Sequence, residues 1–429
     1  MKGSIEESPV SRRHAYYIVS LLFLLYMFDY IDRLVVVSLF PFIQRDWGLS
    51  DTQCGMLVSA VYWSILIFTL PVSVLIDRWS RKKSIGLMAL FWSLATVTCA
   101  ITKSFGQLFV TRAAIGIGEA GYAPGGTAMI SGLFSHKERA RILGLWNASI
   151  PLGSALGIIL GGVIAEHFGW RHAFGIVALP GLILAILFFY VKDYKTIDLV
   201  KSTRETDLVK QVKMSRSDII RQFTRNRTLI LNNLAFANCT FVTTALLSWL
   251  PTYFFRTQEM SMTQSSTKAG SIMFLAILGA PLGGYLADKW YQKKIRARLF
   301  FPGLTSLITA LILFVALKFF QGTSQYLVFL LVGICAVAFV PAAVAVTQDV
   351  VHPGLRATSL SLNVVIQHLL GSALGPIFVG ILSDRFDIGT ALSFLPLFLC
   401  LAAVLFISGS FFYESDFNKA EKVAIKIED

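Results

Sequence analysis

The pentapeptide Gly153-Ser-Ala-Leu-Gly157 occurs twice in the chain, and its second copy is Gly371-Ser-Ala-Leu-Gly375. Two other related segments, Asp77-Arg-Trp-Ser-Arg-Lys82 and Asp288-Lys-Trp-Tyr-Gln-Lys293, lie at a similar separation along the chain. One short apolar match could arise by chance, but two matches in the same order are much harder to explain that way. The repeat predicts two related halves, and membrane proteins of this kind bind their ligand between the halves near the bilayer midplane.

The glycines of the first copy continue to Gly161 at four-residue spacing, which places Gly153, Gly157 and Gly161 on one helix face. Small residues on such a face let neighbouring membrane helices approach closely. We interpret the face as a packing surface that also suits helices that rock against each other.

The composition is that of a membrane protein. Of 429 residues, 55% are hydrophobic and only 15% are charged, and the mean hydropathy is +0.66. Soluble domains contain roughly 25% charged residues, so a bilayer is the better solvent for this chain. The net charge of +13 does not indicate nucleic-acid binding, because Lys and Arg lie between apolar runs and form no soluble basic face.

About twelve apolar runs approach the roughly 20 residues that a membrane-spanning helix needs. We predict an all-α membrane protein of twelve transmembrane helices in two pseudo-symmetric bundles, at 1–191 and 228–429, the second ending in a cytoplasmic tail. The segment 192–227 is a predicted cytoplasmic linker with a short amphipathic helix that begins at Ser215. The runs lie at 15–43, 52–76, 84–102, 106–133, 139–166, 171–191, 228–255, 267–287, 299–319, 325–350, 357–383 and 390–413.

Basic residues are concentrated in alternate turns, as in the stretch from Arg78 to Lys83 and in the linker. Because Lys and Arg favour cytoplasmic loops, we expect both termini and the linker in the cytoplasm. The shortage of long external loops favours a bacterial inner membrane. We expect a monomer surrounded by membrane lipids.

Five ionisable residues interrupt the apolar runs: Asp29, Asp32 and Arg33 in the first run, and Arg112 and Glu119 in the fourth. A charge at the bilayer centre costs roughly 3 kcal/mol or more unless it is paired or faces water. At helical spacing Asp29, Asp32 and Arg33 are neighbours on one helix face. Arg112 and Glu119 are two turns apart on the same side of their helix. We therefore predict a water-filled cavity between the two runs.

This group of charges indicates proton coupling. A low-dielectric site makes a carboxylic acid retain its proton, and a nearby arginine favours its release, so helix movements that change these neighbours would bind and release protons. Glu119 and Asp32 are the predicted proton carriers, with Asp29 and Arg112 beside them, and Arg33 is a counter-ion that can also bind an anionic substrate. The alternative is a permanent ion pair, Asp32–Arg33 or Glu119–Arg112, that only joins helices. No cofactor is expected.

The second half has neutral polar residues in place of central acids, and we expect it to recognise the neutral part of a substrate. His368 is interpreted as a hydrogen-bonded helix residue. The predicted substrate-binding residues are Arg33, Tyr62, Tyr122, Asn147, Asn233, Asn238, Asn363 and Gln367.

The basic turns after the second and eighth runs have two interpretations. Asp77 with Arg81, and Asp288 with Lys293, can form ion pairs that stabilise an outward-open state and break when the cytoplasmic side opens. Alternatively, the turns only set the topology. The predicted cytoplasmic gate comprises Asp77, Arg78, Arg81, Asp288, Lys289 and Lys293.

These segments resemble the major facilitator superfamily over essentially the whole chain. The turn that starts at Asp77 resembles the signature between the second and third helices, although Ser73 stands where that family usually has glycine. Gly284 occupies the matching position in the second half, and Arg112-Ala-Ala-Ile-Gly116-Ile-Gly118 resembles the fourth-helix signature. The resemblance implies a transporter that works by alternating access.

Within that superfamily, Tyr30-Ile-Asp32-Arg33, Gly116-Ile-Gly-Glu119-Ala120 and Pro151-Leu-Gly153-Ser154 resemble the Spinster-like transporters. Members of that group commonly have asparagine in place of Asp29, so this chain has an additional carboxylate. The resemblance implies a lysophospholipid or a sphingoid lipid as substrate.

A second resemblance, to the anion:cation symporters that import sugar acids, rests on Glu119-Ala-Gly-Tyr-Ala-Pro124 and Trp249-Leu-Pro-Thr-Tyr253. We predict a proton-coupled secondary active transporter of a small organic anion or an amphipathic, lipid-like substrate, and not an enzyme. A sugar-acid or carboxylate symporter is one alternative, and a membrane sensor with the same fold is another. An ATP-driven pump is disfavoured because the sequence has no GxxxxGK[ST] loop.

Overall fold

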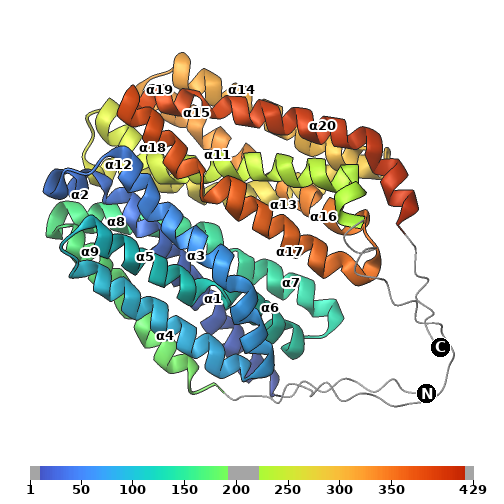
Figure 1. Ribbon diagram of the computed structural model, residues 1–429, viewed down its shortest axis with the longest axis horizontal. Coiled ribbons are helices and arrows are strands. Elements are labelled where there is room, and N and C mark those ends of the chain that lie inside the picture. Colours follow the sequence, from blue (N-terminus) through green and yellow to red (C-terminus); the bar gives the residue numbers. More distant parts are fainter. Residues whose placement is uncertain (1–9, 192–221, 421–429) are drawn as a thin grey trace.

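The computed structural model describes residues 10–191 and 222–420 of the chain. All regular secondary structure in these two ranges is helical, as the sequence predicts. The amphipathic helix predicted to begin at Ser215 starts outside the described residues. Figure 1 shows the helices of the two halves as two neighbouring bundles.

The helices group into twelve spans, because several spans consist of two or three helical pieces. In the first half the pieces are α1 (Arg12–Leu34), the 3-10 helix η1 (Val35–Ser38), α2 (Phe40–Trp47), α3 (Asp51–Arg78), α4 (Arg81–Ala100), α5 (Phe105–Glu119), α6 (Tyr122–Leu133), α7 (His136–Asn147), α8 (Ser149–Phe168) and α9 (Trp170–Phe188).

In the second half they are α11 (Arg227–Thr257), α12 (Met262–Phe274), α13 (Ala276–Tyr291), α14 (Ala297–Lys318), α15 (Gly322–Cys335), α16 (Val340–Asp349), the 3-10 helix η2 (Pro353–Leu355), α17 (Arg356–Ile366), the π-helix η3 (Gln367–Ser372), α18 (Gly375–Arg385), α19 (Ile388–Ser393) and α20 (Leu395–Lys419).

Ten helical stretches in the described residues are long and apolar enough to cross a bilayer. The first and fourth spans are not among them. The first has charged residues within α1, and the fourth is interrupted between α5 and α6 at Ala120 and Gly121. These two spans carry all five of the ionisable residues predicted to lie inside the membrane.

Local chemistry determines where α2 ends and α3 begins. Gly48 adopts a left-handed conformation with φ of 64° and terminates α2, a position that favours glycine because it has no Cβ. The Ser50 hydroxyl then accepts a hydrogen bond from the Gln53 amide at 3.2 Å, and the Gln53 side chain accepts one from the Ser50 amide at 3.0 Å. This capping box starts α3 at Asp51.

The repeated pentapeptide packs in the same way in both halves. A Cβ at Gly153 or Gly157 of α8 would collide with the backbone of α1 at Met27 and Ile31. A Cβ at Gly371 or Gly375 would similarly collide with the backbone of α11 at Ala237 and Phe241. The fifth span therefore contacts the first as the eleventh contacts the seventh, which confirms the predicted packing surface and relates the two halves.

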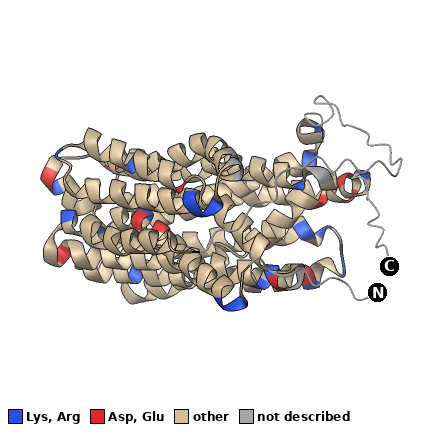
Figure 2. Ribbon diagram, turned by 90° about the horizontal axis from the view of Figure 1, so that it is seen from below, with Lys and Arg blue, Asp and Glu red and all other residues tan. Residues whose placement is uncertain are grey.

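The described residues nearest the two termini lie at one end of the molecule, here called the terminal end, and the α2–α3 turn lies at the distal end (Figure 1). Figure 2 views the same molecule from below, with its charged residues coloured and the described residues nearest the two termini again at one end. Every hydrogen bond or ion pair that joins two described residues of different halves lies between the distal end and mid-depth. The two halves are thus closed on each other at the distal end.

Candidate substrate and proton site

The buried charges lie where the first and fourth spans change geometry. Asp29, Asp32 and Arg33 belong to the last turns of α1, just before the chain tightens into η1 at Val35. Glu119 is the last residue of α5. Both positions are about midway along their spans, and short non-α segments inside helices often mark functional sites.

Arg33 joins the two spans through its guanidinium group. Its Nη2 atom lies 2.8 Å from Asp29 Oδ2 and also 2.8 Å from Glu119 Oε2. All three residues are at most 5% exposed. The structure therefore brings together three of the predicted site residues, but it forms neither of the permanent pairs considered from sequence, Asp32–Arg33 and Glu119–Arg112.

Arg112 has a different role from that predicted. Its guanidinium donates to the backbone carbonyl oxygens of Asp32 at 2.9 Å, Arg33 at 2.6 Å and Leu57 at 3.3 Å. The residue is fully buried. Basic side chains commonly satisfy carbonyl groups where a helix ends, so Arg112 fixes the end of α1 against α3 and α5 and thereby positions Arg33.

Three predicted polar residues of the second half form one chain of hydrogen bonds. The Gln367 amide group donates to Asn363, and Asn363 Nδ2 donates to Asn233 Oδ1 at 2.8 Å. Gln367 begins the π-helix η3. Asn238 is not part of this chain, because its side chain donates to the Leu234 carbonyl of its own helix at 2.8 Å.

Tyr62 connects the charged group to the second half. The Arg33 Cζ atom lies 5.6 Å from the centre of the Tyr62 ring and 4.5 Å from that of Tyr30. The Tyr62 ring also stacks on His368 of η3, with ring centres 5.6 Å apart and planes inclined by 27°. Sequence reasoning interpreted His368 as a hydrogen-bonded helix residue, but its buried Nδ1 atom has no hydrogen-bond partner among the described residues.

Two predicted cavity residues lie elsewhere. Tyr122 is fully buried, and its hydroxyl donates to the Leu22 carbonyl at 2.7 Å beside Trp146. Its ring contacts Tyr26 and Trp92, so in this structure it packs α6 against α1. Asn147 is exposed at the end of α7.

The predicted gate residues at the terminal end make contacts within one half. Asp288 pairs with Arg298 at 2.5 Å and not with the expected Lys293, because the start of α14 brings Arg298 to the end of α13. Arg298 also lies 3.4 Å from Asp349. Arg81 donates to the Ala128 carbonyl at 3.5 Å. Lys289 lies over the Tyr285 ring at 6.0 Å, and the side chains of Asp77 and Arg78 lie outside the described part of the structure.

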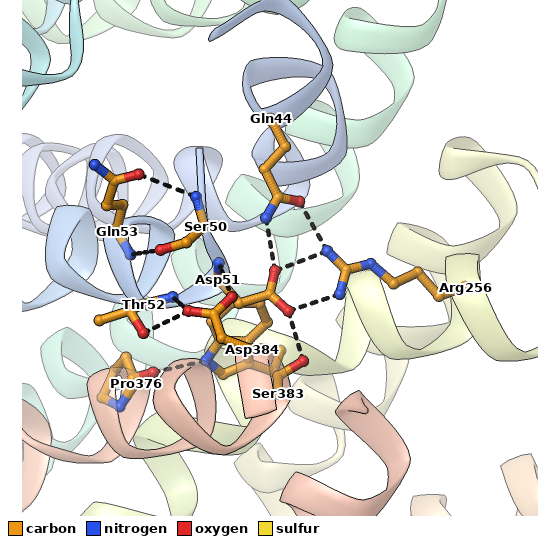
Figure 3. A network of polar contacts seen from close by, with 10 residues as sticks. Gln44, Ser50, Asp51, Thr52, Gln53, Arg256, Pro376, Ser383 and Asp384 are labelled. Atoms are coloured by element: carbon orange, nitrogen blue, oxygen red, sulfur yellow. Dashed lines mark hydrogen bonds and ion pairs between the residues drawn. The ribbon is translucent and has the colours of Figure 1, made fainter. Parts of the chain in front are cut away.

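A polar network at the distal end was not predicted from the sequence (Figure 3). Asp51, at the start of α3, accepts hydrogen bonds from both terminal nitrogens of Arg256 at 2.7 and 2.8 Å. It also accepts from Ser383 at 2.5 Å and from Gln44 at 2.6 Å. Asp51 and Gln44 belong to the first half, whereas Arg256 and Ser383 belong to the second.

Asp384 adds a second connection between the halves. Its carboxylate accepts from the backbone amides of Asp51 at 2.7 Å and Thr52 at 2.9 Å, and from the Thr52 hydroxyl at 2.6 Å. A carboxylate is favourable at a helix N-terminus because it pairs with free amides and with the helix dipole. We call Gln44, Asp51, Thr52, Arg256, Ser383 and Asp384 the distal network.

Two pseudo-symmetric helical halves, closed on each other at one end with ionisable groups buried at mid-depth, define a multi-pass membrane transporter and not an enzyme. The chain belongs to the Major Facilitator Superfamily, whose sequence profile matches residues 22–376.

Within that family the chain is Spinster-like. It is 28% identical to Protein spinster homolog 1 of Xenopus laevis, over 96% of this chain and 84% of that protein. It is also 28% identical to the Sphingosine-1-phosphate transporter SPNS2 of Xenopus tropicalis, over 92% of this chain and 81% of that protein.

Solved structures show the same fold. A bacterial homolog to the human lysosomal transporter Spinster, in an inward-facing and unoccupied conformation, superposes with a TM-score of 0.84 at 21% identity, covering 97% of this chain and 100% of that one. Its inward-facing and occupied conformation gives a TM-score of 0.78 at 24% identity, with the same coverage. A D-xylose-proton symporter gives 0.71 at 14% identity, covering 93% of this chain and 97% of that one.

Proposed function

We propose that this protein is a proton-coupled secondary active transporter of an amphipathic, lipid-like organic anion. The observation that carries the proposal is the position of Arg33 between Asp29 and Glu119 at mid-depth. A guanidinium is permanently charged and suits phosphate or carboxylate groups. An anionic head group can therefore compete with Glu119 for Arg33.

The balance of buried charges supports a proton at this site. Asp29, Asp32 and Glu119 provide three carboxyl groups, whereas Arg33 and Arg112 provide two guanidinium groups. A buried charge without a partner is strongly destabilising, and arginine does not give up its proton. We therefore expect at least one of the three carboxyl groups to be protonated when no substrate is bound.

Exchange at Arg33 gives a route for coupling. When a substrate anion binds Arg33, Glu119 loses its counter-ion and becomes a better proton acceptor. When the anion leaves, Arg33 returns to Glu119 and favours proton release. Substrate and proton occupancy are thus linked through one side chain, and the neutral chain Gln367–Asn363–Asn233 is available to bind the uncharged part of the substrate.

The basic residues at the terminal end favour the cytoplasm for that side. With this orientation the closed distal network faces outward, and the structure corresponds to an inward-facing state. Transport would then require the distal network to separate while the terminal end closes. We place the protein as a monomer in a bacterial inner membrane, with both termini in the cytoplasm.

The relatives favour a lipid-like substrate over a sugar acid. One of them is named a sphingosine-1-phosphate transporter, and its substrate is an amphipathic anion. A thermal-shift comparison on purified protein tests the choice: stabilisation by a sphingoid phosphate or a lysophospholipid, and not by hexuronates, is expected. Stabilisation by hexuronates alone would favour the carboxylate symporter.

The coupling role of Glu119 is tested in proteoliposomes with an imposed pH gradient. Glu119→Gln is expected to abolish pH-driven uptake while the protein remains folded, because the amide has no proton to exchange and no charge to pair with Arg33. Glu414→Gln, at an exposed position near the terminal end, is the matched control and should transport normally. Undiminished pH-driven uptake by Glu119→Gln would show that the coupling proton is elsewhere.

A further inference from the structure

A groove on the outer side of the first half lies apart from the Arg33 site. It opens between α3 and α4, and its volume is about 430 Å³, within the range of pockets that hold small molecules. Figure 1 shows α4 at the outer edge of the first bundle, away from the second half. The walls are mostly apolar side chains such as Leu75 of α3 and Leu87 and Phe91 of α4. The groove therefore faces the hydrocarbon of the bilayer and not the space between the halves.

The groove is about as long as one leaflet of the bilayer is thick. Along α4 its lining extends from Ser84, in the first turn, to Leu94, ten residues later. At 1.5 Å per residue this distance is roughly 15 Å, half of the roughly 30 Å of a hydrocarbon core. Because α4 begins at the terminal end, the groove extends from the membrane surface at that end to about mid-depth. Its length suits one acyl chain of the leaflet on that side.

The polar groups of the groove lie at its terminal end. Among the described lining residues, the side chains with polar atoms are those of Trp79 and Ser84. Ser84 is 4% exposed, and its hydroxyl has no hydrogen-bond partner among the described residues. Interior polar atoms nearly always have a partner, so this exception needs an explanation. A ligand oxygen in the groove would provide one.

Two lysines stand beside this polar end. Lys83 Nζ lies 5.9 Å from the centre of the Trp79 ring, and Lys82 precedes it in the first turn of α4. Neither ammonium group forms an ion pair with another described residue. Two positive charges are thus available at the membrane surface, where the groove ends.

We propose that this groove binds one anionic phospholipid of the adjacent leaflet. An acyl chain lies along Leu87 and Phe91, an ester or phosphate oxygen accepts a hydrogen bond from Ser84, and Lys82 and Lys83 hold the anionic head group. The order of the groups carries the assignment: apolar walls for the depth of a leaflet, then a tryptophan and a hydroxyl at the interface, then cations at the surface. Tryptophan favours the interface, and basic clusters beside a membrane helix attract anionic lipids.

The lipid site borders the interruption of the fourth span. Its inner end is at Ile117 and Gly118, just before Glu119. A Cβ at Gly121 would collide with three side chains that also line the groove, those of Val72, Ile76 and Met88. A bound acyl chain therefore packs on the side chains that surround the interruption between α5 and α6. Binding requires neither substrate nor proton, so this inference does not rest on the proposed function.

Native mass spectrometry of the full-length protein in detergent, titrated with dioleoyl phosphatidylglycerol or dioleoyl phosphatidylcholine, tests the head-group contacts. One phosphatidylglycerol should be retained more tightly than phosphatidylcholine, which has the same chains. Lys82→Gln combined with Lys83→Gln should weaken phosphatidylglycerol binding about fivefold for each lysine at low salt and leave phosphatidylcholine binding unchanged. Ser84→Ala should weaken the binding of both lipids, because both have the oxygens that its hydroxyl reaches.

The control for the lysine pair is Lys293→Gln combined with Lys294→Gln. These exposed residues occupy the equivalent turn of the second half, so the same charge is lost at the same end of the molecule. Retention of both lipids should match the wild type. The melting temperature of each variant without added lipid checks that it is folded.

A second variant tests the chain-binding part of the groove. Leu87→Trp places a larger side chain between the walls and should reduce the retention of both lipids. Leu179→Trp is its control, because Leu179 is an exposed leucine of α9 outside the groove. It should retain both lipids as the wild type does.

Three outcomes would overturn the proposal. Equal retention of the two lipids by the wild type would exclude recognition of an anionic head group. An equal loss in the two lysine pairs would assign the effect to charge at the terminal end in general. Undiminished binding in both Ser84→Ala and Leu87→Trp would place the bound lipid outside this groove. Inorganic phosphate at the same concentrations should not displace the lipid, and displacement would show that the acyl chain contributes nothing.

Discussion

Two buried arginines, Arg33 of α1 and Arg112 of α5, perform different tasks. Arg33 faces carboxylates and can exchange them for a substrate anion, whereas Arg112 binds three backbone carbonyl groups and has no carboxylate partner. The charge pattern placed these residues at one predicted cavity between the first and fourth runs, but it left open which carboxylates meet Arg33 and which meet Arg112. It did not predict the role of Arg112, because that role depends on where α1 ends in space, and the sequence has no signal for it.

Replacement of Arg112 tests this distinction. Arg112→Lys keeps the charge, but an ammonium on a flexible stem cannot span three carbonyl groups as a planar guanidinium does. Losing one or two such bonds should cost about 2–3 kcal/mol, which lowers the melting temperature by several degrees and reduces transport. Arg13→Lys, at an exposed position of α1, is the control. Equal melting temperatures for Arg112→Lys and the wild type would contradict a structural role.

Asp29 provides a second test at the residue scale. Asp29→Asn removes one of the two carboxylates that share Arg33, so that Arg33 is paired with Glu119 alone. Because a negative neighbour is removed, Glu119 should ionise more readily, and the pH at which uptake is half-maximal should fall. The measurement is the initial rate of uptake across a pH series. An upward shift would show that Asp29 does not act on Glu119 through charge.

At the scale of elements, the site lies where spans are interrupted. The first span changes from α1 to η1 after Arg33, the fourth breaks after Glu119, and the eleventh includes the π-helix that begins with Gln367. The apolar runs predicted nearly all spans to within a few residues. The breaks themselves could not be located, because apolar sequence on both sides of a break has the same pattern as a continuous helix.

The distal network also could not be predicted. Asp51, Arg256 and Asp384 lie at the ends of three helices that are far apart in the sequence, α3, α11 and α18, and each resembles an ordinary polar residue at a helix end. Their contacts depend on how the two halves close, which is a property of the assembled fold. Within the second half, the packing of α14 on α13 pairs Asp288 with Arg298 and not with the nearby Lys293, and this pairing too depends on the tertiary fold.

Arg256→Gln is expected to weaken the closed distal end. The Arg256 side chain is 34% exposed, so solvent screening limits its contribution to about 1 kcal/mol, and the population of distally open molecules should rise roughly fivefold. Spin labels at Lys103 and Lys318, exposed distal positions of the two halves, should report longer distances. Arg45→Gln, at the same end but outside the distal network, should not change them. An unchanged distance distribution in Arg256→Gln would show that the distal network does not hold this end closed.

For the whole molecule, the scaffold is symmetric and the chemistry is not. The repeated glycines pack the fifth span on the first and the eleventh on the seventh, so the two halves share one packing arrangement. Among the described residues the buried charges lie only in the first half, and amides occupy the matching region of the second. Such a division lets the first half respond to protons and the second half to the neutral part of a substrate. Coupling then requires a contact between the halves that links the movement of one to that of the other.

The stacked rings of Tyr62 and His368 at mid-depth can link the movements of the two halves, because Tyr62 also packs on Arg33. Tyr62→Phe keeps both ring contacts and should retain proton-driven uptake within about twofold. Tyr62→Ala removes an aromatic contact worth roughly 1 kcal/mol and a cation–π contact of similar size. Together these correspond to about a thirtyfold loss of proton-driven uptake, and Tyr17→Ala, at an exposed tyrosine of α1, serves as the control. If Tyr62→Phe were as defective as Tyr62→Ala, the hydroxyl and not the stacked ring would connect the two halves.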